Sequence, residues 1–317
     1  MHKVRKFLTV IILIAVVVLS FCGCGTQPAQ PAPKSSPVAK PTSPPAFDAA
    51  ELTKKATWEA YDKVLDEIRI GSFPIDAVTA KNRMQGKEND YYIIDLRSAE
   101  DYAKKHVKNA VNLSIVQLAE NIGKLPADKT LLLYCYTGQS SALAMAPLKV
   151  YGYKAIFVNG GFSSIEQAGF AMDTRNIAFT PAAEKKPEDP RAAAVLTGVQ
   201  ANLLAIARQH SVKTLVISQP DTKELVEGSP SKYMFVDLRP KEDYDSGHIK
   251  GSISAPMAEL RSKVPALPRD KRLILCCKSG QLAAMTTAPL TAEGFKIVSL
   301  CAGFSQVEEK NFPMEKK

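Results

Sequence analysis

The chain has 317 residues, of which 45% are hydrophobic and 23% charged, and its formal net charge is +9. This composition is typical of a globular protein, and the length predicts two domains of ordinary size. The basic residues are spread along the chain with few aromatic residues among them. That pattern argues against a nucleic-acid-binding groove and is compatible with a small anionic substrate. The six cysteines form no CxxC pair and do not alternate with histidines, which argues against a zinc site.

Residues 1–24 are typical of a targeting segment. Basic residues in the first six positions precede an uncharged apolar run, 7–21, that is too short to span a membrane comfortably. Cys22 and Cys24 follow, and a cysteine in this place resembles the lipidation site of a bacterial lipoprotein. Either cysteine can be that site, and a plain secretory signal or an uncleaved anchor is the alternative. Lipidation predicts a protein of the cell envelope that faces the periplasm or the outer surface.

A Pro-, Ala- and Ser-rich stretch at 25–50 predicts a disordered tether that separates the folded part from the membrane. Residues 52–70 then place Trp58, Tyr61 and Leu65 at helical spacing, and residues 193–210 show a similar pattern. We interpret both segments as packing helices, and Trp58 as a residue of the core or of a contact between domains.

From about Gly86 to Met172 the chain matches itself, without a gap, at a shift of 142 residues. The clearest matches are Asp95-Leu96-Arg97 with Asp237-Leu238-Arg239, Glu100-Asp101-Tyr102 with Glu242-Asp243-Tyr244, His106 with His248, Cys135 with Cys277, and Gly161-Phe162 with Gly303-Phe304. A period of this length indicates two whole domains and not a solenoid. The sequence therefore predicts a first domain at 51–172, a polar, proline-containing linker at 173–192 and a second domain at 193–317.

Each copy predicts the same order of elements. A short helix before Gly86 or Gly228 precedes a strand at 91–96 or 233–238. A second strand at 131–135 or 273–277, a helix through Leu148 or Leu290 and a third strand at 155–159 or 297–301 follow. Apolar strands separated by helices predict an α/β fold, with a mainly parallel sheet covered by helices on both faces. Active residues of such sheets lie at the carboxyl ends of the strands, where both Cys135 and Cys277 fall.

The segments L-L-L-Y-C-Y-T-G-Q-S-S from Leu131 and L-I-L-C-C-K-S-G-Q-L-A-A from Leu273 carry the candidate chemistry. A buried strand that ends in a thiol, a tight loop and a helix start bring backbone N–H groups and a helix N-terminus to one point. We expect these groups to favour the thiolates of Cys135 and Cys277 and to lower the pKa of both thiols. The predicted binding loops are Tyr136, Thr137, Gly138, Gln139 and Ser140 in the first copy and Lys278, Ser279, Gly280, Gln281 and Leu282 in the second.

The series D-L-R-x-x-E-D-Y, H-V/I, C-x-x-G-Q and G-G-F or A-G-F resembles the rhodanese family of sulfurtransferases, at about 74–172 and again at 216–314. The resemblance implies that each cysteine accepts a sulfane sulfur as a persulfide and passes it on. The donor is then a small sulfur-containing anion, such as thiosulfate or polysulfide, or a persulfide. The acceptor is a thiol or a redox partner protein. No cofactor is implied.

The resemblance also implies supporting roles for residues outside the loops. Arg97 and Arg239, which follow Asp95 and Asp237, mainly hold structure by pairing with acids such as Glu100 or Glu242. We interpret His106 and His248 as packing and hydrogen-bonding residues and not as general bases. Members with two domains usually keep the cysteine only in the second, whereas both copies keep it here.

The two copies differ around the cysteine. Lys278 stands where the first copy has Tyr136, so we expect the second pocket to take anionic donors such as thiosulfate better. Ser140 and Ser141 can add hydroxyl donors that Leu282 and Ala283 lack. Cys276 is expected to be a buried structural thiol, and Cys301, at the end of the third strand, is a remote candidate for a resolving thiol.

Two other functions remain open from the sequence. A non-catalytic rhodanese-like module would bind a partner protein or sense sulfur or redox state. A phosphatase or arsenate reductase needs a wider loop that ends in an arginine to clamp a tetrahedral oxyanion, and these loops end at Ser140 and Leu282.

Overall fold

The structure is a computed structural model, and it describes residues 49–69, 73–209, 227–299, 303–304 and 312–316. The predicted signal, Cys22, Cys24, Cys301 and most of the tether lie outside the described residues, so lipidation and envelope location stay predictions. Among the described residues, none of the helices is both long and apolar enough to cross a membrane. The described residues all belong to one compact unit. We use "repeat 1" for residues 73–173 and "repeat 2" for the described residues of 227–316.

Repeat 1 is built on a parallel sheet of five strands in the order β1-β6-β5-β2-β4. Its strands are β1 (Pro74–Ile75), β2 (Tyr91–Asp95), β4 (Val111–Asn112), β5 (Thr130–Tyr134) and β6 (Ala155–Val158), and a small antiparallel pair joins β3 (His106–Val107) to β7 (Met172–Asp173). Its helices are α2 (Ala77–Met84), α3 (Ala99–Lys104), α4 (Ile115–Glu120), α5 (Gln139–Val150) and α6 (Gly161–Gln167), with short 3-10 turns at Glu88–Asp90 and Ile122–Lys124.

Repeat 2 keeps the same plan. The described part of its sheet is parallel, in the order β10-β8-β11-β12. Its strands are β8 (Tyr233–Asp237), β10 (Ile253–Ser254), β11 (Arg272–Cys276) and β12 (Lys296–Ser299), with the antiparallel pair β9 (His248–Ile249) and β13 (Met314–Glu315). Its helices are α9 (Lys241–Ser246), α10 (Leu260–Lys263) and α11 (Gln281–Ala292), with 3-10 turns at Pro230–Lys232 and Val264–Ala266. The short helix predicted before Gly228 lies mostly outside the described residues.

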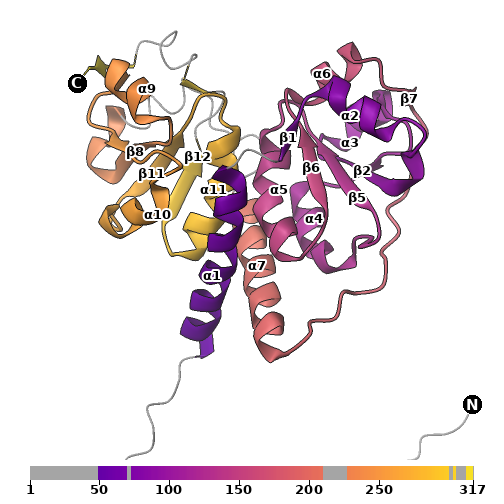
Figure 1. The fold of residues 1–317 in the computed structure, drawn as a ribbon, viewed down its shortest axis with the longest axis horizontal. Helices are drawn as coiled ribbons and strands as arrows, with labels where there is room; N and C mark the ends of the chain where they lie inside the picture. The colour runs from indigo at the N-terminus through magenta and orange to yellow at the C-terminus, as the bar shows by residue number, and fades with distance from the viewer. Residues whose placement is uncertain (1–48, 70–72, 210–226, 300–302, 305–311, 317) are drawn as a thin grey trace, which may run out of the picture. The chain divides into compact units, whose positions relative to one another are not determined.

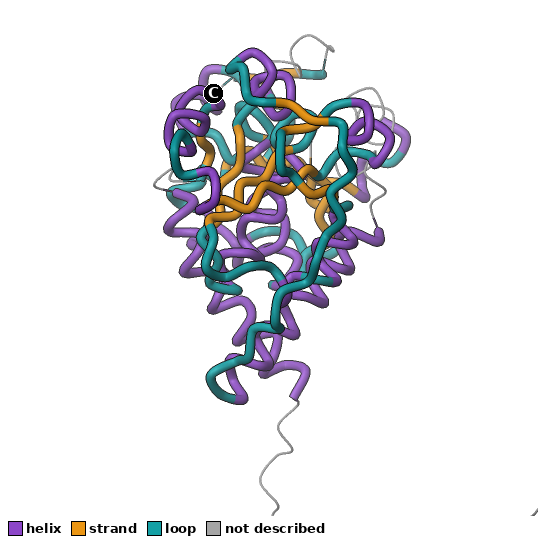
Figure 2. The backbone as a smooth tube through the Cα atoms, turned by 90° about the vertical axis from the view of Figure 1, so that its right-hand side faces the viewer, coloured by secondary structure: helices purple, strands orange, loops and turns teal. Residues whose placement is uncertain are grey.

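The predicted α/β fold is confirmed, and the alternation of the central strand explains it. Along β5, Leu131 and Leu133 point into one apolar cluster, and Leu132 and Tyr134 point into a second cluster on the other face of the sheet. Because both faces of the strand are apolar, both are covered by helices, and Figures 1 and 2 show helices on either side of the strands. The strands end close to the predicted positions, so Cys135 and Cys277 each follow directly after a buried strand.

Two long helices, α1 (Ala49–Arg69) and α7 (Pro190–Gln209), precede the two repeats, as the periodicity predicts. The first begins two residues inside the predicted tether, and the second begins three residues inside the predicted linker. They pack on each other, and each also packs on both α5 and α11. Trp58 lies against the apolar clusters of both repeats, which confirms its interpretation as a core or contact residue. Where the two helices touch, a Cβ at Gly198 would lie 2.2 Å from Thr57 Oγ1, so any larger residue at 198 would require Thr57 to shift.

Candidate functional site

In repeat 1 the sulfur of Cys135 lies at the base of loop 1, which we define as Cys135–Ser140. The side chain is only 2% exposed. The Gly138 N–H donates to Sγ at 3.1 Å, and Gly138 can close the loop because its φ of +92° suits a residue without a Cβ. Ser141 Oγ lies 3.6 Å from Sγ and 3.0 Å from the Gly138 carbonyl oxygen. The predicted donors are therefore present, and of the two serines it is Ser141 that reaches the sulfur.

In repeat 2 the sulfur of Cys277 occupies the corresponding place in loop 2, Cys277–Leu282. Gly280, with φ +78°, again precedes the helix, and the Ala283 N–H donates to Sγ at 3.4 Å. Burial raises the pKa of the Cys277 thiol, and hydrogen bonds from four amides, the first of them that of Ala283, act in the opposite direction. The predicted lowering of this thiol pKa is therefore wrong. The loop donors are in place, but removal of the thiolate from water is the larger effect.

Both loops lie against a glycine from the G-F pair of their own repeat. A Cβ at Gly161 would lie 2.5 Å from the Cys135 carbonyl oxygen, and a Cβ at Gly303 would lie 1.9 Å from the Lys278 carbonyl oxygen. The next residue donates its N–H to the cysteine carbonyl, at 2.8 Å from Phe162 and 2.9 Å from Phe304. The role of this glycine in supporting the loop was not predicted from the sequence, although the recurrence of the G-F pair in both copies was the available signal.

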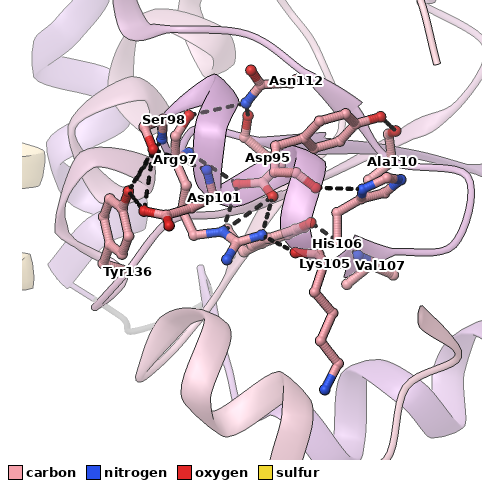
Figure 3. A network of polar contacts seen from close by, with 12 residues as sticks. Asp95, Arg97, Ser98, Asp101, Lys105, His106, Val107, Ala110, Asn112 and Tyr136 are labelled. Carbon is pink, nitrogen blue, oxygen red and sulfur yellow. Dashed lines mark hydrogen bonds and ion pairs between the residues drawn. The ribbon is translucent and has the colours of Figure 1, made fainter. Parts of the chain in front are cut away.

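A buried ion pair supports loop 1 from β2. Asp95 is fully buried, and the Arg97 guanidinium donates to both of its carboxylate oxygens, with the shortest distance, 2.7 Å, from Nη2 (Figure 3). Arg97 Nη2 also donates to the Lys105 carbonyl oxygen at 2.6 Å, and the guanidinium lies over the Phe162 ring, 3.5 Å from its centroid. Arg97 thus connects the end of β2 to Lys105, which follows α3, and to Phe162, whose N–H donates to the Cys135 carbonyl oxygen.

Repeat 2 reproduces this pair. Arg239 Nη2 lies 2.7 Å from Asp237 Oδ2 and 2.7 Å from the Gly247 carbonyl oxygen, and its guanidinium lies over Phe304. Both arginines form a buried ion pair, but the partners predicted for them are wrong. The arginines pair with Asp95 and Asp237, two residues earlier, because these carboxylates are buried with them. Glu100 is exposed and pairs with Lys104.

Both histidines are packing residues, as predicted. His106 is fully buried, its Nδ1 lies 2.7 Å from the Tyr102 carbonyl oxygen, and its ring stacks on that of Tyr102 at 3.8 Å. His248 makes the same contacts with Tyr244, and its Nε2 lies 3.2 Å from Glu315 Oε1.

The residue that follows the cysteine is Tyr136 in loop 1 and Lys278 in loop 2, and the two make different contacts. The Tyr136 hydroxyl donates to Asp101 Oδ2 at 2.5 Å and lies 3.1 Å from Ser98 Oγ (Figure 3). Together with Lys104 and Ser98, this hydrogen bond lowers the pKa of Asp101 to about 2. Tyr136 is thereby held against α3, with 44% of its surface exposed. Lys278, its counterpart, is exposed beside Cys277.

The two glutamines of the loops are buried, and each reaches the other loop. Gln139 Nε2 donates to the Ser279 carbonyl oxygen at 3.4 Å. Gln281 Nε2 donates to the Thr137 carbonyl oxygen at 3.4 Å and to Asn159 Oδ1 at 2.7 Å. Loop 1 and loop 2 therefore lie side by side, which the alignment of the repeats does not predict.

Cys276 has a structural position, as predicted. It is 1% exposed, its Sγ lies 3.6 Å from the Val236 carbonyl oxygen, and burial raises the pKa of its thiol well above the ordinary value. Cys276 belongs to the apolar cluster on the opposite face of the sheet from Cys277, so it takes no part in loop 2.

The comparisons with known proteins agree with this architecture. The family model described as a rhodanese-like domain matches residues 76–168 and 218–310. A thiosulfate sulfurtransferase GlpE of Coxiella burnetii is 35% identical over 79 residues, which are 25% of this chain and 74% of that protein. A tRNA sulfurtransferase of Desulfurococcus amylolyticus is 39% identical over 74 residues, which are 23% of this chain and 14% of that protein.

A solved structure with similarity to the chain is a thiosulfate sulfurtransferase from Pseudomonas aeruginosa, at 17% sequence identity and a TM-score of 0.34. The similarity covers 83% of this chain and 48% of that one, so the chain spans about half the length of this structure.

Proposed function

The chain belongs to the rhodanese-like family, and from this premise we propose that it is a sulfurtransferase with two sulfur-carrying cysteines, Cys135 and Cys277. The observation that carries the proposal is the position of each sulfur. Each sulfur is buried at the base of a loop that ends where a helix starts. The Gly138 amide donates to the Cys135 sulfur, and the Ala283 amide, in the first turn of α11, donates to the Cys277 sulfur. Such donors stabilise a thiolate, and they can equally stabilise the terminal sulfur of a persulfide.

The proposed reaction has two displacements at sulfur. The cysteine loses its proton, and its thiolate attacks the outer sulfur of a donor such as thiosulfate. The S–S bond of the donor breaks, and sulfite leaves with the electron pair, so that a persulfide remains on the cysteine. An acceptor thiolate or cyanide then attacks the terminal sulfur, and the cysteine thiolate leaves. No oxidant or reductant is consumed.

The direct test is sulfur transfer from thiosulfate or polysulfide to cyanide by the full chain, compared with Cys135→Ser, Cys277→Ser and the double variant. We expect each single variant to keep the activity of the other site and the double variant to lose the transfer. In parallel, incubation with the donor alone should add the mass of one sulfur atom to the peptides of Cys135 and Cys277.

Two results contradict the proposal. Full transfer activity in the double variant removes both cysteines from the reaction. Absence of the added sulfur on both peptides of the parent, together with no transfer, favours the alternative of a non-catalytic binding or sensing module.

A further inference from the structure

The glutamines of the two loops connect the two sulfur sites. We propose that Gln281 and Gln139 are positioning residues that act crosswise. Gln281 holds the peptide group that donates a hydrogen bond to the Cys135 sulfur, and Gln139 holds the peptide group of the corresponding loop glycine, Gly280, beside Cys277. Each cysteine site is then incomplete without the neighbouring repeat. The proposal rests on the proposed function in taking Cys135 and Cys277 as the sulfur-carrying thiols.

The geometry at Cys135 shows how Gln281 would act. The peptide group between Thr137 and Gly138 has two polar ends, which point in opposite directions because the group is planar and trans. Its N–H donates to Cys135 Sγ at 3.1 Å, and its carbonyl oxygen accepts from Gln281 Nε2 at 3.4 Å. Gln281 therefore touches the far end of the group that touches the sulfur.

The position of the Gln281 side chain is itself fixed. Gln281 is 7% exposed, and its Nε2 also donates to Asn159 Oδ1 at 2.7 Å. A Cβ at Gly138 would lie 2.7 Å from Gln281 Nε2. Glycine at 138 thus serves two purposes: it permits a φ of +92°, and it leaves space for a side chain from repeat 2.

The reciprocal contact exists at Cys277. Gln139 is 4% exposed, and its Nε2 donates at 3.4 Å to the Ser279 carbonyl oxygen, which belongs to the peptide group of the Gly280 N–H. The Gly280 N–H is one of the amides that favour the Cys277 thiolate. The helices that begin at these glutamines, α5 and α11, pack directly on each other, so both contacts occur together.

The expected consequence is electrostatic. A peptide group whose carbonyl oxygen accepts a hydrogen bond is a stronger N–H donor, because hydrogen bonds in a chain polarise one another. The glutamine also prevents the peptide group from turning its N–H away from the sulfur. Loss of the glutamine amide should therefore destabilise the thiolate in the other repeat and raise the pKa of that thiol.

The test measures the pH dependence of alkylation of both thiols in the same full-length molecule. Iodoacetamide is the probe, and peptide mapping by mass spectrometry reports Cys135 and Cys277 separately. Gln281→Met and Gln139→Met keep the length of the side chain and remove its amide. Gln85→Met, at an exposed position at the end of α2, is the matched control.

We expect Gln281→Met to raise the pH of half-maximal alkylation of Cys135 by about half a pH unit or more, with little change at Cys277. Gln139→Met should raise it at Cys277, with little change at Cys135. Gln85→Met should change neither. The thiol in the repeat that carries the substitution serves as the internal control for folding.

A change confined to the thiol of the substituted repeat overturns the proposal, because the glutamine then acts within its own loop. Equal changes at both thiols also overturn it, since they indicate a loosened contact between α5 and α11. Alkylation requires no sulfur donor. A crossed shift in a protein that fails to transfer sulfur would therefore leave the positioning role intact and reject only the proposed function.

Discussion

In repeat 1 the Cys135 sulfur lies near the Gly138 amide and the Ser141 hydroxyl, and in repeat 2 the Cys277 sulfur accepts from the Ala283 amide, with no side-chain hydroxyl at the matching position. Outside the loops the repeats agree closely. Both have a buried Asp–Arg pair, a His ring stacked on a Tyr ring, and a glycine against the cysteine loop.

This comparison separates two kinds of residue. The Asp–Arg pair, the glycine behind the loop, and the cysteine, glycine and glutamine of the loop are the same in both repeats, so we infer that they build the loop. The residue after each cysteine and the residue at 141 or 283 differ, so they can give the two cysteines different reactivity. Substitution of a shared residue should therefore affect both repeats alike, whereas substitution of a residue that differs should affect the two cysteines differently.

The largest effect is expected from the buried ion pair. Arg97→Leu leaves Asp95 as a buried carboxylate without its guanidinium, and the free energy of unfolding should fall by about 3–5 kcal/mol. Arg239→Leu should cost about as much. Arg175→Leu is a matched control, because Arg175 also pairs with an aspartate two residues earlier but is 71% exposed; its cost should be much smaller than that of Arg97→Leu. Urea denaturation measures all three, and equal costs for Arg97 and Arg175 would contradict the buried-pair account.

The next effect concerns the glycine behind each loop. Gly161→Ala places a Cβ against the backbone of loop 1, at a residue with φ +62°, and Gly303→Ala does the same to loop 2 at φ +83°. Each should cost about 2–4 kcal/mol, and each should impair sulfur uptake by the cysteine of its own repeat.

Gly251→Ala is the control for the glycine variants. Its φ is +75°, but open space surrounds the added methyl group, so only backbone strain of about 1 kcal/mol is expected. Unfolding free energies and the mass increment on each cysteine distinguish the cases. If Gly161→Ala resembles Gly251→Ala in both measurements, the contact between Gly161 and loop 1 contributes neither to stability nor to sulfur uptake.

These shared features show how much the sequence alone can predict. Repetition identified the domains, and the apolar runs that end at Cys135 and Cys277 located both strands, both loops and both helix starts. Local patterns suffice for such features, because strand alternation and loop glycines act over a few neighbouring residues.

Contacts between segments far apart in the chain could not be predicted from the sequence. The pairing of Gln281 with Thr137 joins residues 144 positions apart, and no periodicity reports it. The direction of the Cys277 pKa was also wrong, because the donors can be counted in a motif but the depth of burial cannot. The partner of Arg97 was missed for the same reason: burial selected Asp95 over the exposed Glu100.

The first differing position to test is Ser141 and its counterpart Ala283. In a Cys135→Ser background, the rate of sulfur uptake by Cys277 should keep rising at pH values above the ordinary thiol pKa of about 8.5. The reason is that burial raises the pKa of Cys277 and only the thiolate reacts. Ala283→Ser adds a hydroxyl donor, so the rise should move to lower pH, with about threefold to tenfold faster uptake at pH 7.

The reverse exchange completes this test. In a Cys277→Ser background, Ser141→Ala removes the hydroxyl near Cys135 and should slow uptake at pH 7 by a similar factor. The measurement is the rate of persulfide formation as a function of pH. If neither exchange shifts the pH dependence of persulfide formation, the hydroxyl at position 141 is not the cause of a difference in reactivity between the two cysteines.

The smallest effect is expected at the residue beside each cysteine. Lys278 is an exposed charge, so its attraction for thiosulfate is partly screened, and Lys278→Ala should raise the KM for thiosulfate at Cys277 by about two- to fivefold at low salt.

The reverse exchange, Tyr136→Lys, should not lower the KM for thiosulfate at Cys135. Asp101 and Ser98, which now bind the Tyr136 hydroxyl, offer the new ammonium group a carboxylate partner away from the sulfur. Tyr136→Lys combined with Asp101→Asn removes that partner and should lower the KM at Cys135. Equal thiosulfate kinetics at the two cysteines in the parent, at low salt, would show that Lys278 gives loop 2 no preference for anionic donors.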